Sequence, residues 1–201
     1  MTRRRLFLFV EGNDDERFFA KVIVPLFESR YRSVHIVKFA CMKRASVCRL
    51  VTGIHRMKDD FLVFADIDNE PGVKAKKHLL MERFCALDSR DIIVIIREIE
   101  SWYLAGLDEA AERDLSLPHH HATDALSKEY FNSRIPRRFA SRIAFMLEIL
   151  ARFSATVACR KNRSFHYFVS RYHLVPCDAA PDDWREGAGT EIPPEHLSQT
   201  R

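Results

Sequence analysis

The chain has 201 residues, of which 47% are hydrophobic and 30% charged, and its formal net charge is +4 at pH 7. This composition is typical of one globular domain of ordinary size with a small appendage. It excludes a membrane span, which needs about 20 consecutive apolar residues, and the run LFLFV near the start is too short for a secretory signal. We therefore expect a cytoplasmic protein without a membrane partner.

The number and spacing of the cysteines limit the kinds of cross-link and metal site that the sequence predicts. The cysteines are odd in number and contain no C-x-x-C pair, so the sequence predicts neither a disulfide framework nor a thiolate zinc site. We expect reduced thiols, most of them buried. The five residues are Cys41, Cys48, Cys85, Cys159 and Cys177.

The first half of the sequence alternates between strand-like and helix-like segments. An apolar run at residues 6–10 predicts a strand, and residues 14–30 predict a helix that Pro25 kinks or splits. The same alternation then repeats three times. Further strands are expected within residues 33–40, 61–68 and 91–96, and further helices within residues 44–58, 72–87 and 97–113.

This alternation predicts an α/β fold of the doubly wound, Rossmann-like kind, with a mainly parallel sheet and helices on both faces. We assign it to residues 1–110. Residues 111–177 lack the strand pattern and predict a helical C-terminal extension packed on the first domain. Residues 178–201 are poor in apolar side chains and predict a flexible tail.

Carboxylates follow the predicted strands directly. Glu11 comes after the first strand, Asp66 and Asp68 end the third, and Glu98 and Glu100 follow the fourth. Function collects at the carboxyl ends of the strands in parallel sheets. Carboxylate oxygens are ligands for the hard cation Mg²⁺, which can neutralise phosphate charge and generate a nucleophilic water. The pattern therefore predicts an acidic metal site at one edge of the sheet.

Two stretches carry a family resemblance, FVEGNDDERFF and, about fifty residues later, VFADIDNEPG. Over roughly the first half of the chain they resemble the signature motifs of the TOPRIM (topoisomerase and primase) family. In that family a glutamate follows the first strand and a D-x-D pair follows the third. The resemblance implies that Glu11, Asp66 and Asp68 bind Mg²⁺, with Mn²⁺ as an alternative, and leaves open whether Glu11 is a ligand or transfers a proton.

The segment IIVIIREIESWYLAGLD resembles a small group of stand-alone TOPRIM-like proteins. That resemblance implies Glu100 as a further catalytic residue and metal ligand, with Glu98 as a weaker candidate; a helix cap or an ion pair with Arg97 explains the same letters. A topoisomerase tyrosine domain or a primase zinc module does not fit in this chain. The family's nucleases match best, and resemblance alone points to phage-defence or mobile-element systems.

Two basic runs include aromatic residues, RIPRRFASR and RKNRSFHYF. They predict contacts with the phosphates of nucleic acid, DNA in preference to RNA, with Ser164 donating a further hydrogen bond. Solvated helix faces, and a helix cap at Ser164, are the alternative interpretation. The predicted phosphate-contacting residues are Arg137, Arg138, Arg160, Lys161 and Arg163.

Other interpretations remain open. The chain lacks a G-x-x-x-x-G-K-[ST] nucleotide loop, so a catalytically silent TOPRIM-fold protein that binds nucleic acid or regulates a separately encoded ATPase is the main alternative. A flavodoxin-like receiver also gathers acids at strand ends but does not explain Glu11. The consecutive residues His119, His120 and His121 lack the spacing of a zinc helix and predict a loop.

Overall fold

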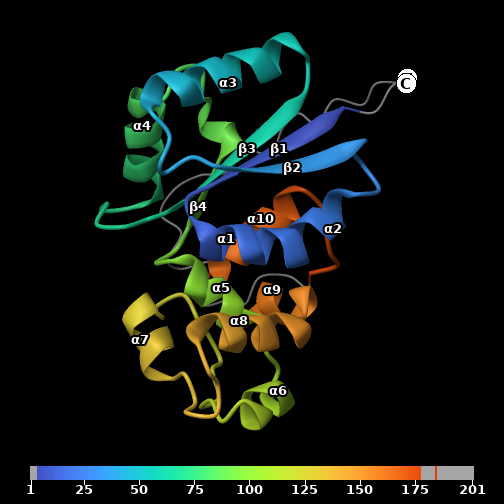
Figure 1. Cartoon of the computed structure of the whole chain (residues 1–201), viewed down its shortest axis with the longest axis vertical. Helices are drawn as coiled ribbons and strands as arrows, with labels where there is room; N and C mark the ends of the chain where they lie inside the picture. Colours follow the sequence, from blue (N-terminus) through green and yellow to red (C-terminus); the bar gives the residue numbers. More distant parts are fainter. Residues whose placement is uncertain (1–3, 178–183, 185–201) are drawn as a thin grey trace.

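The computed structural model describes residues 4–177 and Trp184, so the predicted tail at residues 178–201 lies, apart from Trp184, outside the described residues. In the described part, four parallel strands form one sheet in the order β2-β1-β3-β4 (Figure 1). Helices pack against both faces, which confirms the predicted doubly wound α/β fold. The strands are β1 (Arg5–Val10), β2 (Ser33–Lys38), β3 (Asp60–Asp66) and β4 (Ile92–Ile95).

One face of the sheet is covered by α3 (Arg44–Arg56) and α4 (Val73–Arg83) (Figure 1). Successive side chains of a strand point to opposite faces, so alternate residues of each strand reach these helices. Phe9 and Val63 are two of them, and they share a buried cluster with residues of both helices. A short 3-10 turn, Ser89–Asp91, leads from α4 into β4.

The opposite face carries the larger core. Leu8 and Phe64 point to this side and share a cluster with Trp102, which is fully buried. The Trp102 ring meets Phe64 edge to face at 6.4 Å and stacks on Phe168 at 5.9 Å. The helices on this face are α1 (Asn13–Phe18), α2 (Val24–Phe27), α5 (Ile99–Ala105) and α10 (Arg163–Arg171).

The first predicted helix is interrupted, as expected from Pro25. A five-residue π-helical turn, Phe19–Ile23, separates α1 from α2, and Pro25 lies in the first turn of α2. Proline has no backbone N–H and its ring obstructs the preceding turn, so a regular α-helix cannot continue through it. The wider turn keeps both halves of the segment on the same face of the sheet.

The helical extension is part of the main core. Its last helix, α10, contacts β4, and the Trp102 indole N–H donates to the Ser164 hydroxyl at 2.8 Å. Phe165 and Phe168 of α10 are fully buried in the same cluster as the strands. The remaining helices of the extension are α6 (Glu109–Asp114), α7 (Lys128–Ser133), α8 (Arg142–Ala151) and α9 (Ala155–Lys161).

The helix expected at residues 97–113 is two helices, because α5 ends at Ala105, with Gly106 as its C-cap, and α6 begins at Glu109. Gly106 lies against the ring of Phe153, where an added Cβ would come within 2.2 Å of two ring carbons. Its carbonyl accepts a hydrogen bond from Ser154 N at 2.9 Å. Close approach between the two segments therefore requires glycine here.

Replacing Gly106 with alanine is expected to destabilise the protein by about 2–3 kcal/mol, because the methyl group forces Phe153 and its segment to move. Guanidinium unfolding measures this change. Gly53 is the matched control, since it lies within α3 with no atom within 4 Å of an added Cβ. Gly53→Ala is expected to stabilise by about 0.5–1 kcal/mol, and equal effects at both positions would contradict this account of Gly106.

The cysteines depart from expectation. Cys48 is joined to Cys85, and Cys159 to Cys177, as disulfides. Sequence spacing did not reveal these pairs because the partners lie on different elements that only the tertiary fold brings together. Cys41 is exposed and free, and only Cys159 is buried, so the expectation of mostly buried thiols was wrong. In the described part of the chain, no helix has the length and apolar character needed to cross a membrane.

Candidate functional site

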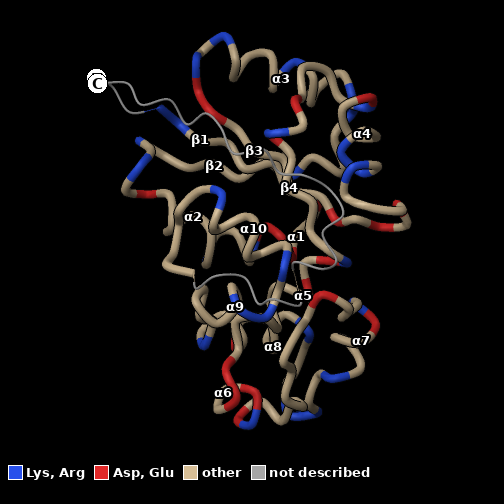
Figure 2. Tube along the Cα trace, turned by 180° about the vertical axis from the view of Figure 1, so that it is seen from behind, with Lys and Arg blue, Asp and Glu red and all other residues tan. Residues whose placement is uncertain are grey.

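The acidic residues predicted from the sequence lie at the carboxyl edge of the sheet. β1 and β3 are adjacent and parallel, so Glu11 follows one strand where Asp66 ends its neighbour. The pKa of Asp66 responds to the charges of Glu11, Glu98 and Glu100, which places these carboxylates within electrostatic range of one another. Figure 2 shows acidic segments of the trace beside α1 and α5. The fold therefore brings the predicted residues to one region.

Asp66 is the most unusual group in this region. Its Oδ1 atom is buried and has no hydrogen-bond partner, the only such side-chain atom among the described residues. Burial is the main cause that raises its pKa, to about 9, and the negative charges of Asp15 and Glu11 raise it further. A buried carboxylate without a partner is costly, so this atom either keeps a proton or requires a cation.

Glu11 and Asp15 share this environment. Burial raises the pKa of Glu11 to about 7; Lys76 opposes this shift and Asp68 adds to it. Burial likewise raises the pKa of Asp15 to about 6, although its carboxylate accepts a hydrogen bond from Gly12 N at 3.1 Å. That bond closes the first turn of α1, so Asp15 also stabilises the start of this helix.

Asp68 leaves the strand in a strained conformation. Its φ of 51° lies in the left-handed region, and Arg97, just past β4 at the same edge, has a φ of 63°. Such backbone costs energy in residues other than glycine and is often found at functional sites. The Asp68 carboxylate forms an ion pair with Lys76 of α4, whose side chain is buried. Lys76 was not anticipated, because a basic segment gives no sign of which lysine turns inward.

Glu100 is buried at the start of α5 and forms an ion pair with Arg142 of α8. Arg142 also pairs with Asp14, and its Nε donates to Asn132 Oδ1 at 2.8 Å. Burial raises the pKa of Glu100, and the Arg142 charge opposes that shift. Glu100 thus lies in the acidic region as predicted, with a cation from the C-terminal extension already beside it.

Glu98 has a different position from Glu100. It is the N-cap residue of α5, and its carboxylate accepts a hydrogen bond from the backbone N–H of Lys128, at the start of α7. No side-chain cap bond forms within α5 itself. Glu98 therefore links α5 to α7 and contributes negative charge near Asp66.

Some of the C-terminal basic residues are less accessible to a phosphate than the sequence predicts. Lys161 is buried, with its ammonium 3.0 Å from Glu112 Oε1 and donating to the Leu107 carbonyl at 2.6 Å, so the structure does not support its predicted contact with phosphate. Arg138 donates to Ser116 Oγ at 3.1 Å and to the carbonyl of Asp114.

Arg163 lies 4.0 Å from Asp124 in an ion pair that is partly exposed. Arg137, Arg138, Arg160 and Arg163 are exposed and stay candidates for phosphate contact. The buried state of Lys161 could not be read from the run RKNRSFHYF, since its partner Glu112 lies about fifty residues earlier.

Ser164 is also internal. Besides Trp102, it receives a hydrogen bond from Ile96 N at 3.2 Å and donates to Asn162 Oδ1 at 2.7 Å. Asn162, not Ser164, caps α10, because its side chain accepts from Phe165 N at 3.0 Å. Neither the phosphate contact nor the helix cap predicted for Ser164 is supported. Its hydrogen bonds with Ile96 and Trp102 instead link α10 to the end of β4 and to α5.

The three consecutive histidines lie in a loop, as predicted. His119 Nδ1 is 2.6 Å from Glu112 Oε2, and His120 Nδ1 is 3.1 Å from Oε1 of the same carboxylate. His120 Nε2 also contacts the Tyr130 hydroxyl at 2.7 Å. Burial alone would raise the pKa of Glu112, but hydrogen bonds with Lys161 and the two histidines outweigh it and lower the pKa. The Glu112 carboxylate is therefore paired with the cation of Lys161 and with both histidines.

Two further findings bear on the site. Among the described residues, one group of three His, Cys, Asp or Glu side chains has ligand atoms within 4.8 Å of one another. It consists of Cys159, His166 and Cys177 and includes none of the predicted carboxylates.

Comparisons with protein families, curated proteins and solved structures find no match to this chain. The likeness to TOPRIM proteins therefore rests on the sequence motifs quoted above.

Proposed function

We propose that this protein is a Mg²⁺-dependent nuclease of the TOPRIM kind, which hydrolyses phosphodiester bonds in nucleic acid. The observation that carries the proposal is the buried Asp66 Oδ1, which lacks a hydrogen-bond partner in a region crowded with other carboxylates. A bound cation would supply both the missing partner and the missing positive charge. Oxygen donors of this kind suit Mg²⁺, and Mn²⁺ as its substitute.

Of the four carboxylates predicted to bind the metal, two are already engaged in ion pairs and two are not. Among the described residues, neither Asp66 nor Glu11 forms an ion pair, although the charge of Lys76 acts on Glu11, so these two are the residues that would hold the metal. Asp68 would join them once its carboxylate turns from Lys76, and Glu100 would be the auxiliary ligand. When bound, the metal would supply Lewis-acid activation of a phosphate and of a water molecule.

The side chains of this chain have defined tasks in the proposed site. Lys76 stabilises the charge of Asp68, and Arg142 stabilises that of Glu100 and Asp14, so the acidic region does not repel a phosphate as strongly as its carboxylates alone would. Glu11, whose pKa of about 7 lies near neutrality, is suited either to bind the metal or to transfer a proton. The exposed arginines of the C-terminal extension would contact phosphates of the substrate; they are Arg137, Arg138, Arg160 and Arg163.

Mg²⁺ affinity is expected to rise with pH through the range from about 7 to about 9, the raised pKa values of Glu11 and Asp66. Each carboxyl keeps its proton below its pKa, and a metal must displace that proton. One displaced proton gives a change of about tenfold in affinity per pH unit. Isothermal titration calorimetry across this pH range measures the slope, and an affinity independent of pH would contradict the roles of these two carboxylates.

A second function is favoured by the ion pairs of Asp68 with Lys76 and of Glu100 with Arg142. A site whose carboxylates are neutralised internally suits a catalytically silent protein that binds nucleic acid or regulates a separate ATPase. Incubation of labelled DNA and RNA with the protein and Mg²⁺ separates the two. Cleavage, with DNA preferred to RNA, supports the nuclease, whereas stable binding of intact strands supports the silent protein.

A further inference from the structure

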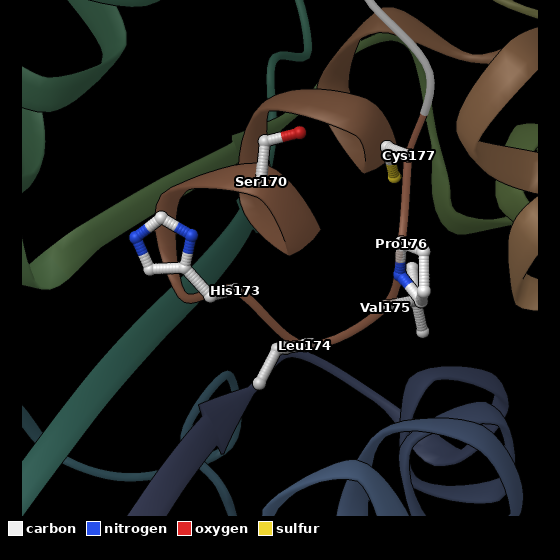
Figure 3. Close-up of a pocket in the computed structure, with 6 residues that line it drawn as sticks. All are labelled: Ser170, His173, Leu174, Val175, Pro176 and Cys177. Atoms are coloured by element: carbon white, nitrogen blue, oxygen red, sulfur yellow. The ribbon is translucent and has the colours of Figure 1, made fainter.

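Cys159, His166 and Cys177 form a cluster away from the acidic region. Cys159 lies near the end of α9, His166 lies on α10, and Cys177 follows α10 in the chain. One ligand atom from each lies within 4.8 Å of the others. Figure 3 shows that Cys177 lines a pocket at the C-terminal end of α10 together with Ser170, His173 and residues 174–176.

The imidazole of His166 is held beside the sulfur atoms. Its Nδ1 lies 3.4 Å from Cys159 Sγ and 3.1 Å from the Cys159 carbonyl oxygen, and the ring meets Trp184 edge to face at 5.5 Å. Two ligands of a tetrahedral zinc ion, with bonds of about 2.3 Å to sulfur and about 2.0 Å to nitrogen, lie about 3.5 Å apart. The sulfur and nitrogen therefore already have the separation of two zinc ligands.

We propose that the reduced protein binds Zn²⁺ through Cys159, His166 and Cys177. The structure holds the two cysteines as a disulfide, which is the oxidised form of the same site. A thiol reductant supplies two electrons and two protons to give two thiols, and Zn²⁺ then displaces those two protons. In the metal-bound form the Nδ1 lone pair of the neutral imidazole faces the ion, and its contact with the Cys159 carbonyl is given up.

The chemistry of the donors selects the metal. Thiolate and imidazole are the soft and borderline ligands that suit zinc, whereas Mg²⁺ prefers oxygen. Two thiolates also balance the charge of Zn²⁺, so the complex is neutral, which suits the buried Cys159. Three protein ligands leave one of four tetrahedral positions for water or another small ligand. Metal binding at this site would hold residues 172–177, which follow α10, against α9 and α10.

Cobalt is the spectroscopic probe for this site. The full chain is reduced with a phosphine, stripped of metal with a chelator and titrated with Co²⁺ in excess Mg²⁺, which competes with Co²⁺ for oxygen ligands. We expect a thiolate-to-cobalt charge-transfer band at one Co²⁺ per chain, which added Zn²⁺ abolishes. Cys177→Ser is expected to lose most of this band, and His166→Gln to shift the visible cobalt bands and weaken binding.

The other cysteine pair provides the matched control. Cys48 and Cys85 also form a disulfide, but among the described residues no third His, Cys, Asp or Glu ligand completes a group with them. The double variant Cys48→Ser/Cys85→Ser is expected to bind Co²⁺ as the wild type does. The absence of a thiolate band in the reduced wild type would overturn the proposal, as would a band that survives in both His166→Gln and Cys177→Ser. Circular dichroism verifies that each variant is folded.

Discussion

Replacing Asp66 with asparagine is expected to abolish metal-dependent cleavage, with a loss of about 100-fold or more, because the substitution removes the charged oxygen donor at the centre of the acidic region. Asparagine keeps the size of the side chain, so the fold should persist. Cleavage of labelled DNA by purified wild type and variant measures the effect. Full activity in a folded Asp66→Asn protein would contradict the proposed role of Asp66.

The same substitution is expected to raise thermal stability in the absence of metal. The pKa of Asp66 is about 9 in the folded protein and near its ordinary value of 3.8 in the unfolded chain. As pH rises between these values, the unfolded chain releases a proton that the folded protein keeps, so the wild type loses stability. The variant lacks this group, and its advantage in Tm should grow from about pH 4 to about pH 9.

Asp60 is the matched control for Asp66. It lies at the other end of β3, and its exposed carboxylate pairs with Arg4 at 3.0 Å. Asp60→Asn is expected to leave cleavage unchanged and to alter stability by less than about 1 kcal/mol. Added Mg²⁺ should raise the Tm of wild type and Asp60→Asn but not that of Asp66→Asn, because only a folded protein with the site gains binding energy from the metal.

The largest expected loss of stability comes from Lys161→Met. Lys161 neutralises Glu112, whose side chain is 1% exposed. Removing the cation leaves a buried carboxylate whose remaining partners, among the described residues, are His119 and His120. Removing one partner of a buried ion pair costs about 3–5 kcal/mol. This corresponds to a Tm lower by about 10 °C, which differential scanning calorimetry measures.

A double-mutant cycle separates the ion pair from packing. The variant Lys161→Met/Glu112→Gln removes both charges, so it should be less unstable than the sum of the single variants by more than about 1 kcal/mol. Lys74→Met, at an exposed position of α4, is the control for removing a lysine charge and should change stability by less than about 0.5 kcal/mol. Additive effects in the cycle would show that Lys161 does not act through Glu112.

The fold was largely predictable from local patterns, because apolar runs and the periodicity of the helices report which residues are buried. The acids after β1 and β3 were predictable for the same reason, since a strand end places the next side chain at a known edge of the sheet. The break at Gly106 was missed, although a glycine at the end of α5 and an Asp108 N-cap at the start of α6 are local signals of it. The close approach of Phe153, which makes glycine necessary there, comes from a distant segment and leaves no local signal.

The partners of the charged groups were also beyond reach of the sequence. Arg142 pairs with Glu100, and Lys161 with Glu112, each across more than forty residues of the chain. Lys76 pairs with Asp68 only eight residues away, but the sequence does not show which lysine of α4 turns inward. The disulfide between Cys159 and Cys177 depends on how the chain returns after α10. A basic run in the sequence identifies a charged segment, but the tertiary fold decides which of its side chains face solvent.

The most direct test of the central proposal is cleavage of labelled DNA and RNA by the purified wild type, with Mg²⁺ in one reaction and EDTA in the other. We expect cutting that requires Mg²⁺ and disappears with EDTA and in Asp66→Asn. Strands that stay intact with Mg²⁺ and Mn²⁺ while binding to the protein would contradict it, and so would cutting that persists in EDTA.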